Sequence, residues 1–206
     1  MQKKKILELY KTIYNFDKYA ILNFNEAEIT KLLVNSYLTL KISFSNMVKD
    51  LSEKLNDVNA KNILNTIGSD SRIGKKYMQS GGPYAGPCFP RDNQALLHFS
   101  KSVNYKNELN KGVIKTNLLT LENLKLQLNI IKKKNFSSIF FGGIGYKPNT
   151  PSMESSFILE LIKHCKKINL EVYYYDRYIG EKINYAKRVL ELKNFRKYSS
   201  IIFLPY

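Results

Sequence analysis

The first two thirds of the chain carry a helical hydrophobic pattern. Apolar side chains recur at every third or fourth position over 27–56, which predicts an amphipathic helix of about 30 residues and about 45 Å. The same pattern predicts shorter helices over 3–14, 59–67, 92–101 and 106–133. Because a helix as long as 27–56 exceeds what a small domain can cover, we expect it to connect domains or to form the seam of a dimer.

A compact apolar run at 19–24 lies just before the long helix and predicts a strand. Asn25 then stands where a helix N-cap would, and Glu26 and Glu28 place negative charge in the favourable first turn. Since an α/β unit ends with a helix, a strand and a cap, we expect residues 1–25 to be the tail of a larger domain.

The pattern changes after residue 135. A buried-strand run at 138–141 is followed by a glycine turn, a predicted helix over 154–167 and a second strand at 170–175, which together indicate a βαβ unit with a parallel pair. A further helix is predicted over 181–193 and a third strand at 200–204. The predicted fold class is therefore α/β, with a helical central domain at 26–134 and a partial parallel α/β domain at 135–206.

Composition indicates a globular protein. The chain has 206 residues, of which 44% are hydrophobic, so it can bury a core and is not a disordered chain. No apolar stretch approaches the roughly 18 residues of a membrane span, and the N-terminus lacks the apolar core of a signal peptide, so we expect a soluble, cytoplasmic protein. Cys88 and Cys165 are too few for a disulfide framework and are expected to be reduced thiols. His164 and Cys165 do not share a helix face, so no metal site is expected.

The net charge of +16 would suit a protein that binds nucleic acid, because a basic surface releases counterions from phosphate backbones. Of the 33 basic residues, however, 28 are lysine and 5 are arginine, whereas base and phosphate recognition favours the forked guanidinium. The lysines are also spread along the chain. We therefore interpret the charge as a solvated surface and do not expect nucleic acid as a partner.

The most unusual segment for chemistry is the glycine- and proline-rich stretch 81–92 around Cys88. Such a stretch fixes a backbone path that lets a ligand approach the sulfur, and Asp92 is expected to open the next helix. If the positive end of that helix and Arg91 lie beside the thiol, they would favour the thiolate and make Cys88 a nucleophile. A buried, inert cysteine with Asp92 as a simple cap is the alternative.

Two weaker patterns also bear on function. Lys31 and Asn35 lie four residues apart on the long helix, so they project from one face and could donate hydrogen bonds to an oxyanion. An isolated pair at this spacing, however, favours a solvated surface. The glycines in 142–145 follow a strand and resemble half of a dinucleotide fingerprint. Pro148 and Asn149 stand where the fingerprint would continue, so a purely structural turn remains the alternative.

Four segments taken together resemble the nucleotide-sugar dehydrogenase family, the UDP-glucose and UDP-N-acetylmannosamine 6-dehydrogenases. They are AEITKLLVNSYLTLKISFSN at 27–46, DSRIGKKY at 70–77, GPCFPRD at 86–92 and GIGYKPNT at 143–150, in the family's order and at about its spacing. The resemblance implies a two-step, NAD-dependent oxidation of a UDP-sugar's primary alcohol to a carboxylate. Residues 1–25 would end a truncated NAD-binding Rossmann domain, 26–134 would form the dimerisation domain, and 135–206 would form part of a Rossmann-like UDP-binding domain.

The resemblance also implies catalytic roles. Cys88 would capture the sugar aldehyde as a thiohemiacetal and then as a thioester. Lys31 and Asn35 would stabilise oxyanions, and Asp92 would position or activate the hydrolytic water. Cys88 and Arg91 would contact the cofactor NAD.

Substrate binding is implied in the same way. The nucleotide-sugar site would be lined by Tyr77, Gln79, Tyr84, Ala85, Phe89, Tyr146 and Lys147. Arg72 would reach the substrate of the neighbouring subunit in a homodimer that forms through the long helix 27–56.

The chain departs from the family's pattern in several places. Most of the NAD-binding domain is missing, so we expect no dehydrogenase activity from the isolated chain unless a separate NAD-binding polypeptide complements it. The family's Gly-Tyr-Gly-Gly before the nucleophile is replaced here by residues 84–87, which place Pro87 next to the thiol. Glu154 stands where the family has an arginine, and a carboxylate there would repel phosphate. The alternative function is a non-catalytic remnant that dimerises or binds nucleotide sugars.

Overall fold

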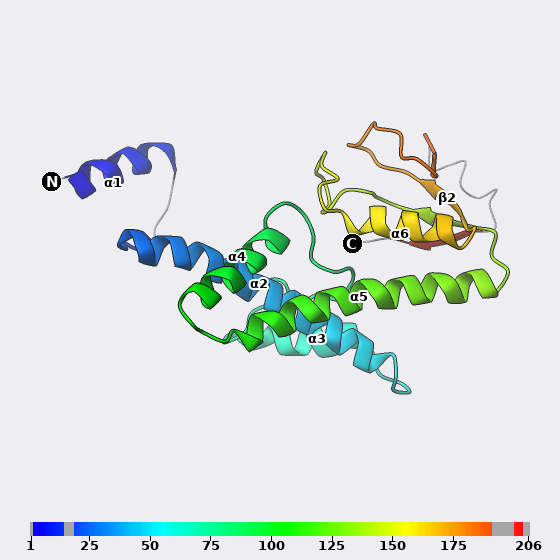
Figure 1. The fold of residues 1–206 in the computed structure, drawn as a ribbon, viewed down its shortest axis with the longest axis horizontal. Helices are drawn as coiled ribbons and strands as arrows, with labels where there is room; N and C mark the ends of the chain where they lie inside the picture. The colour runs from blue at the N-terminus through cyan, green and yellow to red at the C-terminus, as the bar shows by residue number, and fades with distance from the viewer. Residues whose placement is uncertain (1, 15–18, 191–199, 204–206) are drawn as a thin grey trace. The chain divides into compact units, whose positions relative to one another are not determined.

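The computed structural model describes residues 2–14, 19–190 and 200–203 (Figure 1). The chain forms two compact units, Met1–Lys31 and Leu32–Tyr206. The first unit contains helix α1 (Gln2–Ile13) and the beginning of helix α2 (Phe24–Ser52). The helix predicted over 3–14 is therefore confirmed as α1.

The strand predicted at 19–24 is wrong. Residues 19–23 have no regular secondary structure, and α2 already begins at Phe24. An isolated strand leaves its backbone N–H and C=O groups unpaired, and the described sheet offers this segment no neighbouring strand.

The predicted cap Asn25 is also wrong, because Asn23 takes that place. The Asn23 side chain accepts a hydrogen bond from the Glu26 backbone N–H at 2.9 Å, and the Glu26 carboxylate accepts one from the Asn23 N–H at 2.9 Å. This reciprocal pair is a capping box, which satisfies two backbone donors at the helix start.

The helical part of the second unit consists of the rest of α2, α3 (Ala60–Ser69), α4 (Phe89–Ser102) and α5 (Glu108–Lys133). The prediction of one long helix is confirmed by α2, which is 29 residues long. Asn59 and Asn107 cap α3 and α5 through their side chains. The four helices predicted by periodicity in this region all form, within a few residues of the expected ends.

The face of α2 that packs inside the unit is polar and small. Its buried residues are Thr39, Ser43, Ser45, Asn46, Val48 and Ser52. Thr39 and Asn93 of α4 bond to each other through their side chains at 3.0 Å, and Asn110 of α5 donates to the Asn93 carbonyl at 2.8 Å. Several residues of the predicted apolar stripe instead lie exposed on the outer side of α2, namely Leu33, Tyr37, Phe44, Met47 and Leu51.

The α/β part of the second unit contains a four-stranded parallel sheet in the order β3-β2-β1-β4. The strands are β1 (Ser138–Phe141), β2 (Glu171–Tyr174), β3 (Lys187–Arg188) and β4 (Ser200–Phe203), and α6 (Phe157–Lys167) connects β1 to β2. Ile139 on β1 stands opposite Val172 on β2. The α/β fold class and the predicted βαβ unit are confirmed.

One core joins this sheet to the helical part of the unit. Leu124 and Leu128 of α5 are buried in the same cluster as Ile139 of β1 and Ile158 and Leu161 of α6. Helix α6 contacts both α5 and β2, and Figure 1 shows it running alongside the second half of α5. The second half of α5 therefore belongs to the α/β core. The loop between α3 and α4 also meets this part of the unit, with Gly82 against Phe157 and Gly86 against Tyr146.

The helix predicted over 181–193 is wrong for 181–190, and 191–193 lie outside the described residues. This segment forms the short strand β3, and the Val189 N–H donates to the Tyr174 carbonyl at 2.8 Å. The Tyr174 hydroxyl also donates to the Glu181 carbonyl at 2.9 Å and accepts from the Ile183 N–H at 3.3 Å. Pairing with β2 therefore overrides the local helical period. β4 agrees with the strand predicted at 200–204, of which residue 204 lies outside the described residues.

Candidate active site around Cys88

Cys88 lies at the N-cap position of α4, and its side chain is exposed. The Asp92 N–H donates to the Cys88 carbonyl at 2.8 Å, which closes the first helical turn. Pro90 fits this first turn because its missing N–H would have no helical partner there. The prediction that Asp92 caps the helix is wrong, since the helix begins three residues earlier. The Cys88 side chain is exposed at the N-terminal end of the helix, so the alternative of a buried cysteine is wrong, and its role as a nucleophile stays a prediction.

A pocket of about 600 Å³ opens beside Cys88. Its walls come from the segment 77–89, from 146–148 after β1, and from Ile42 and Phe157. This volume lies within the usual range for small-molecule sites. Of the eight residues predicted to bind the nucleotide sugar, Arg72 does not line this pocket and the other seven do: Tyr77, Gln79, Tyr84, Ala85, Phe89, Tyr146 and Lys147.

Aromatic rings give this pocket a firm wall. Phe89 packs edge-on against both Tyr77 and Tyr84, with ring centroids 6.4 Å apart in each pair. Burial raises the pKa of Tyr84 to about 12, so its hydroxyl stays protonated at neutral pH. Elsewhere in the lining, the Lys147 ammonium lies 5.5 Å from the centre of the Tyr146 ring. The pocket therefore offers flat apolar surfaces and one positive charge.

Two asparagines that sequence reasoning missed hold the loop that leads to Cys88. Asn46 on α2 accepts from the Gly81 N–H at 2.9 Å and donates to the Gly82 carbonyl at 3.0 Å. Asn117 on α5 accepts from the Tyr84 N–H at 2.7 Å and donates to the Tyr84 carbonyl at 3.1 Å. Asparagine is unfavourable inside helices, so its presence at these two positions was the available sequence signal.

The same loop is packed tightly on its other side. A Cβ atom on Gly82 would lie 2.1 Å from Cζ of Phe157, and one on Gly86 would lie 2.4 Å from Cδ2 of Tyr146. Gly86 also has a φ of +82°, a conformation that residues with a Cβ rarely adopt. These two glycines allow the loop to lie directly against the two rings.

Asn35, Arg91 and Asp92 come together one helical turn from Cys88. The Asn35 amide donates to an Asp92 carboxylate oxygen at 2.5 Å, and Arg91 Nε donates to the other oxygen at 3.2 Å. The Asp92 side chain is buried, whereas Arg91 is exposed. Lys31 belongs to the compact unit Met1–Lys31, so its predicted place beside the thiol stays a prediction.

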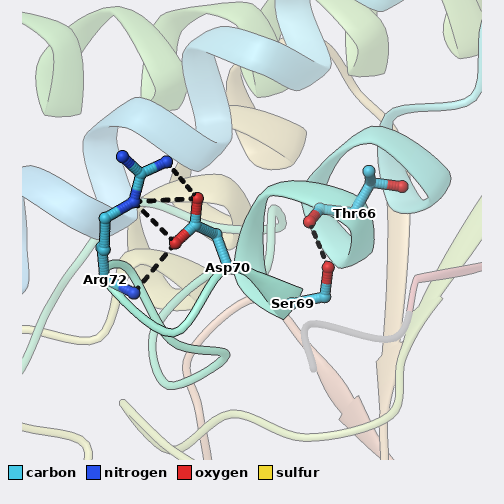
Figure 2. A network of polar contacts seen from close by, with 4 residues as sticks. All are labelled: Thr66, Ser69, Asp70 and Arg72. Atoms are coloured by element: carbon cyan, nitrogen blue, oxygen red, sulfur yellow. Dashed lines mark hydrogen bonds and ion pairs between the residues drawn. The ribbon is translucent and has the colours of Figure 1, made fainter.

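Arg72 lies in the loop after α3 and is not among the residues that line the pocket. Figure 2 shows its guanidinium paired with the Asp70 carboxylate, with Nη2 and Oδ2 2.6 Å apart. This ion pair lowers the pKa of Asp70 and raises the pKa of Arg72. The Arg72 side chain is highly exposed, so it can meet a partner outside its own chain.

The glycine turn after β1 does not fit the pyrophosphate of NAD. A dinucleotide fold directs the backbone N–H groups of this turn, and the start of the helix directly after it, at the phosphates. Here α6 begins only at Phe157, and the Ile144 N–H donates to the Asp176 carboxylate at 3.0 Å. The same carboxylate accepts from the N–H groups of Tyr178 and Ile179 at 2.8 and 3.0 Å. The Asp176 side chain therefore already takes the Ile144 N–H, a backbone donor of this turn that a phosphate would need.

A smaller hollow of about 230 Å³ lies at this edge of the sheet, between 142–150 and 175–178. It is smaller than the usual range for ligand pockets. Glu154, which stands where the family has an arginine, is exposed and precedes α6. This edge of the sheet thus does not fit NAD, and the predicted cofactor contacts of Cys88 and Arg91 stay predictions.

The second cysteine lies in a different environment. Cys165 is fully buried in the α/β core, and burial raises the pKa of its thiol to about 12. Its neighbour His164 points away to bond the Asn129 side chain at 2.8 Å. Among the described residues, no group of three or more His, Cys, Asp or Glu side chains could hold a metal ion. None of the helices in the described ranges combines the length and apolarity needed to cross a membrane.

Comparison with known sequences gives consistent matches. Residues 25–118 match the central domain of the UDP-glucose/GDP-mannose dehydrogenase family. The chain is 30% identical over 175 residues to the UDP-glucose 6-dehydrogenase TuaD of Bacillus subtilis, which covers 79% of this chain and 37% of that protein. It is 30% identical over 190 residues to the UDP-glucose 6-dehydrogenase of Rickettsia prowazekii, covering 90% and 42%. The chain thus spans less than half the length of these curated relatives.

Solved structures agree with the sequence matches. A UDP-glucose dehydrogenase from Pyrobaculum islandicum superimposes with a TM-score of 0.85 at 25% identity, covering 99% of this chain and 48% of that one. The UDP-D-ManNAc dehydrogenase from Pyrococcus horikoshii superimposes with a TM-score of 0.70 at 20% identity, covering 86% and 41%. At that lower identity the second match shows a shared fold.

Proposed function

The chain belongs to the UDP-glucose/GDP-mannose dehydrogenase family, and we propose that it binds a UDP-sugar beside Cys88 and supplies the nucleophile for oxidation of the sugar's primary alcohol to a carboxylate. The observation that carries this proposal is the exposed Cys88 thiol on the wall of a 600 Å³ pocket that also contains Tyr146 and Lys147. The Lys147 ammonium suits a diphosphate, and the rings of Tyr77 and Phe89 suit a planar base.

Cys88 acts at the aldehyde stage. Its thiolate adds to the carbonyl carbon, which forms a carbon–sulfur bond and places negative charge on the carbonyl oxygen. Asn35 uses one amide hydrogen on Asp92 and can direct the second at this oxygen, and Lys31 is the second proposed donor. Conversion of this adduct to a thioester removes a hydride from the carbon, and NAD would accept that hydride. Water that Asp92 positions then attacks the same carbon. The carbon–sulfur bond then breaks, and the products are a carboxylate and the restored thiol.

We place the NAD of the family's reaction outside the described residues, because the glycine turn after β1 does not fit it. Another part of a longer polypeptide, or a separate chain, then holds the dinucleotide. The 206-residue chain incubated with NAD and UDP-glucose should therefore form no NADH, and it should gain activity when a dinucleotide-binding domain of a relative is added. Turnover at an ordinary enzymatic rate by the chain alone would refute this assignment.

We further propose that the chain forms a homodimer through α2. The inner face of this helix is polar, whereas Leu33, Tyr37, Met47 and Leu51 are between 41% and 58% exposed on its outer side. An apolar stripe on a 29-residue helix is typical of a helix seam. The exposed Arg72 side chain would then be available to the partner's pocket. We place the protein in the cytoplasm, where free thiols persist.

Alkylation with iodoacetamide near neutral pH tests the substrate proposal. We expect fast modification of Cys88 and very slow modification of Cys165, whose thiol is buried and protonated. Saturating UDP-glucose should slow the Cys88 reaction about tenfold or more, because the sugar would cover the sulfur, and ADP-glucose serves as the matched control. Equal, slow labelling of both thiols, or no protection by UDP-glucose or UDP-N-acetylmannosamine, would favour the non-catalytic remnant.

A further inference from the structure

We propose that Asn46 and Asn117 are positioning residues that hold the Cys88 loop in its reactive geometry. The inference deepens the proposed function, because it concerns the same pocket. Residues 81–85 form neither helix nor strand, so their backbone polar groups need partners from elsewhere. Asn46 and Asn117 supply these partners from two different helices, α2 and α5.

Each asparagine makes a paired contact that few side chains can replace. Its carbonyl oxygen accepts from a backbone N–H while its NH₂ group donates to a backbone carbonyl, as a neighbouring strand would do. Asn46 is 1% exposed, whereas Gly81 and Gly82 are half-buried, so water does not reach this pair of hydrogen bonds from the α2 side. A carboxylate or an alkyl group at either position would leave at least one backbone group without its partner.

The loop is fixed from two sides. The asparagines hold it from the helical side, and the rings of Phe157 and Tyr146 press on Gly82 and Gly86 from the α/β side. A displacement of the loop toward either side therefore breaks paired hydrogen bonds or overlaps a ring. The loop has one position in which both sets of contacts are satisfied.

Cys88 lies only four residues after Tyr84, the residue that Asn117 binds. Tyr84 is held by Asn117, and Pro87 restricts the backbone immediately before Cys88. Because this segment is short, fixing Tyr84 also restricts where the first turn of α4 can lie. The Cys88 thiol in that turn lines the pocket. Asn46 and Asn117 thus act on the reaction through the loop and do not touch the substrate.

Three alanine variants of the full chain separate positioning from general stability. Asn46→Ala and Asn117→Ala remove the side-chain hydrogen bonds to the Cys88 loop. The control variant Asn123→Ala removes a hydrogen bond between α5 and α2, from Asn123 to Asp50 at 2.9 Å. Asn117 and Asn123 lie on the same helix and are both half-buried, which makes them a matched pair. If Asn46→Ala does not fold, Asn117→Ala still decides the question.

Amide hydrogen exchange provides a measurement that does not depend on activity. We expect exchange at Tyr84 to become about tenfold faster in Asn117→Ala, exchange at Gly81 to accelerate similarly in Asn46→Ala, and both to stay unchanged in Asn123→Ala. Equal exchange in the loop of all three variants and the unmodified chain would overturn the inference.

Protection of Cys88 from iodoacetamide by UDP-glucose is the second measurement. The UDP-glucose concentration that gives half protection should rise about tenfold in Asn46→Ala and in Asn117→Ala and stay unchanged in Asn123→Ala. An equal rise in all three would show a general loss of stability and would overturn the positioning role. Absence of protection in the unmodified chain would instead refute the proposed function, and the exchange rates would then decide the inference by themselves.

Discussion

Substitution of Gly82 by alanine tests the close contact between the Cys88 loop and α6. A Cβ atom there would lie 2.1, 2.4 and 2.8 Å from three ring atoms of Phe157, all closer than real Cβ contacts allow. Phe157 is 5% exposed and belongs to the α/β core, so its ring has little room to move away. One of the two groups must be displaced by more than about 1 Å to restore ordinary contact.

The magnitude follows from two opposing terms. Replacing glycine by alanine in a compatible backbone conformation stabilises a protein by about 0.4–1 kcal/mol through the unfolded state. Overpacking a filled site costs about 1–3 kcal/mol. We therefore expect Gly82→Ala to lower the free energy of unfolding by about 1–2 kcal/mol, as measured by urea denaturation.

A double-mutant cycle and a matched glycine make this measurement specific. Phe157→Leu shortens the ring, so the cost of Gly82→Ala should shrink by about 1 kcal/mol or more in that background. Gly112→Ala, at a helical position with no atom within 4 Å of the new Cβ, should stabilise the chain by about 0.5–1 kcal/mol. A Gly82→Ala protein as stable as the unmodified chain, or a cost independent of residue 157, would refute the reasoning.

Two further predictions concern the loop and the α5–α6 contact. Gly86→Ala should cost more than Gly74→Ala in urea denaturation: both positions have positive φ, which costs about 1–2 kcal/mol for alanine, but only the Cβ at residue 86 meets a ring, that of Tyr146. Equal costs would argue against that contact. Burial lowers the pKa of His164, which favours the neutral ring in the folded state, so its contribution to stability is complete above its ordinary pKa of 6.5 and is lost as pH falls through the lowered value. His164→Gln, which can still bond Asn129, should weaken the fall in unfolding free energy between pH 7.5 and 5, and an unchanged pH dependence would contradict this account.

Elements whose pattern is local were predictable from the sequence. The 29-residue helix α2 and the buried strand β1 follow from the spacing of their own apolar residues, without knowledge of what packs on them. The segments at 19–24 and 181–193 were not predictable in this way. Whether an apolar or amphipathic segment becomes a strand depends on a neighbouring strand, which periodicity does not report.

Some residues of the candidate site were likewise predictable from local sequence, and others were not. Cys88, Tyr146 and Lys147 were identified from short motifs, and the structure brings all three to one pocket. Asn46 and Asn117 were missed because each acts on backbone groups more than 30 residues away in the sequence. Side chains that bind backbone leave no motif, because any residue can supply the N–H and C=O that they hold.

Helix α2 buries mostly polar side chains and exposes apolar ones, and this arrangement affects how stability is divided between folding and association. Within one chain, the helix contributes mainly hydroxyl and amide groups to the interior, while its leucine and tyrosine side chains stay in water. Folding of a single copy therefore buries little of the apolar surface of α2. This helix contributes correspondingly little to the heat-capacity change on unfolding. If two copies pair along α2, dimer formation buries the apolar surface that folding leaves exposed. The melting temperature then rises with protein concentration.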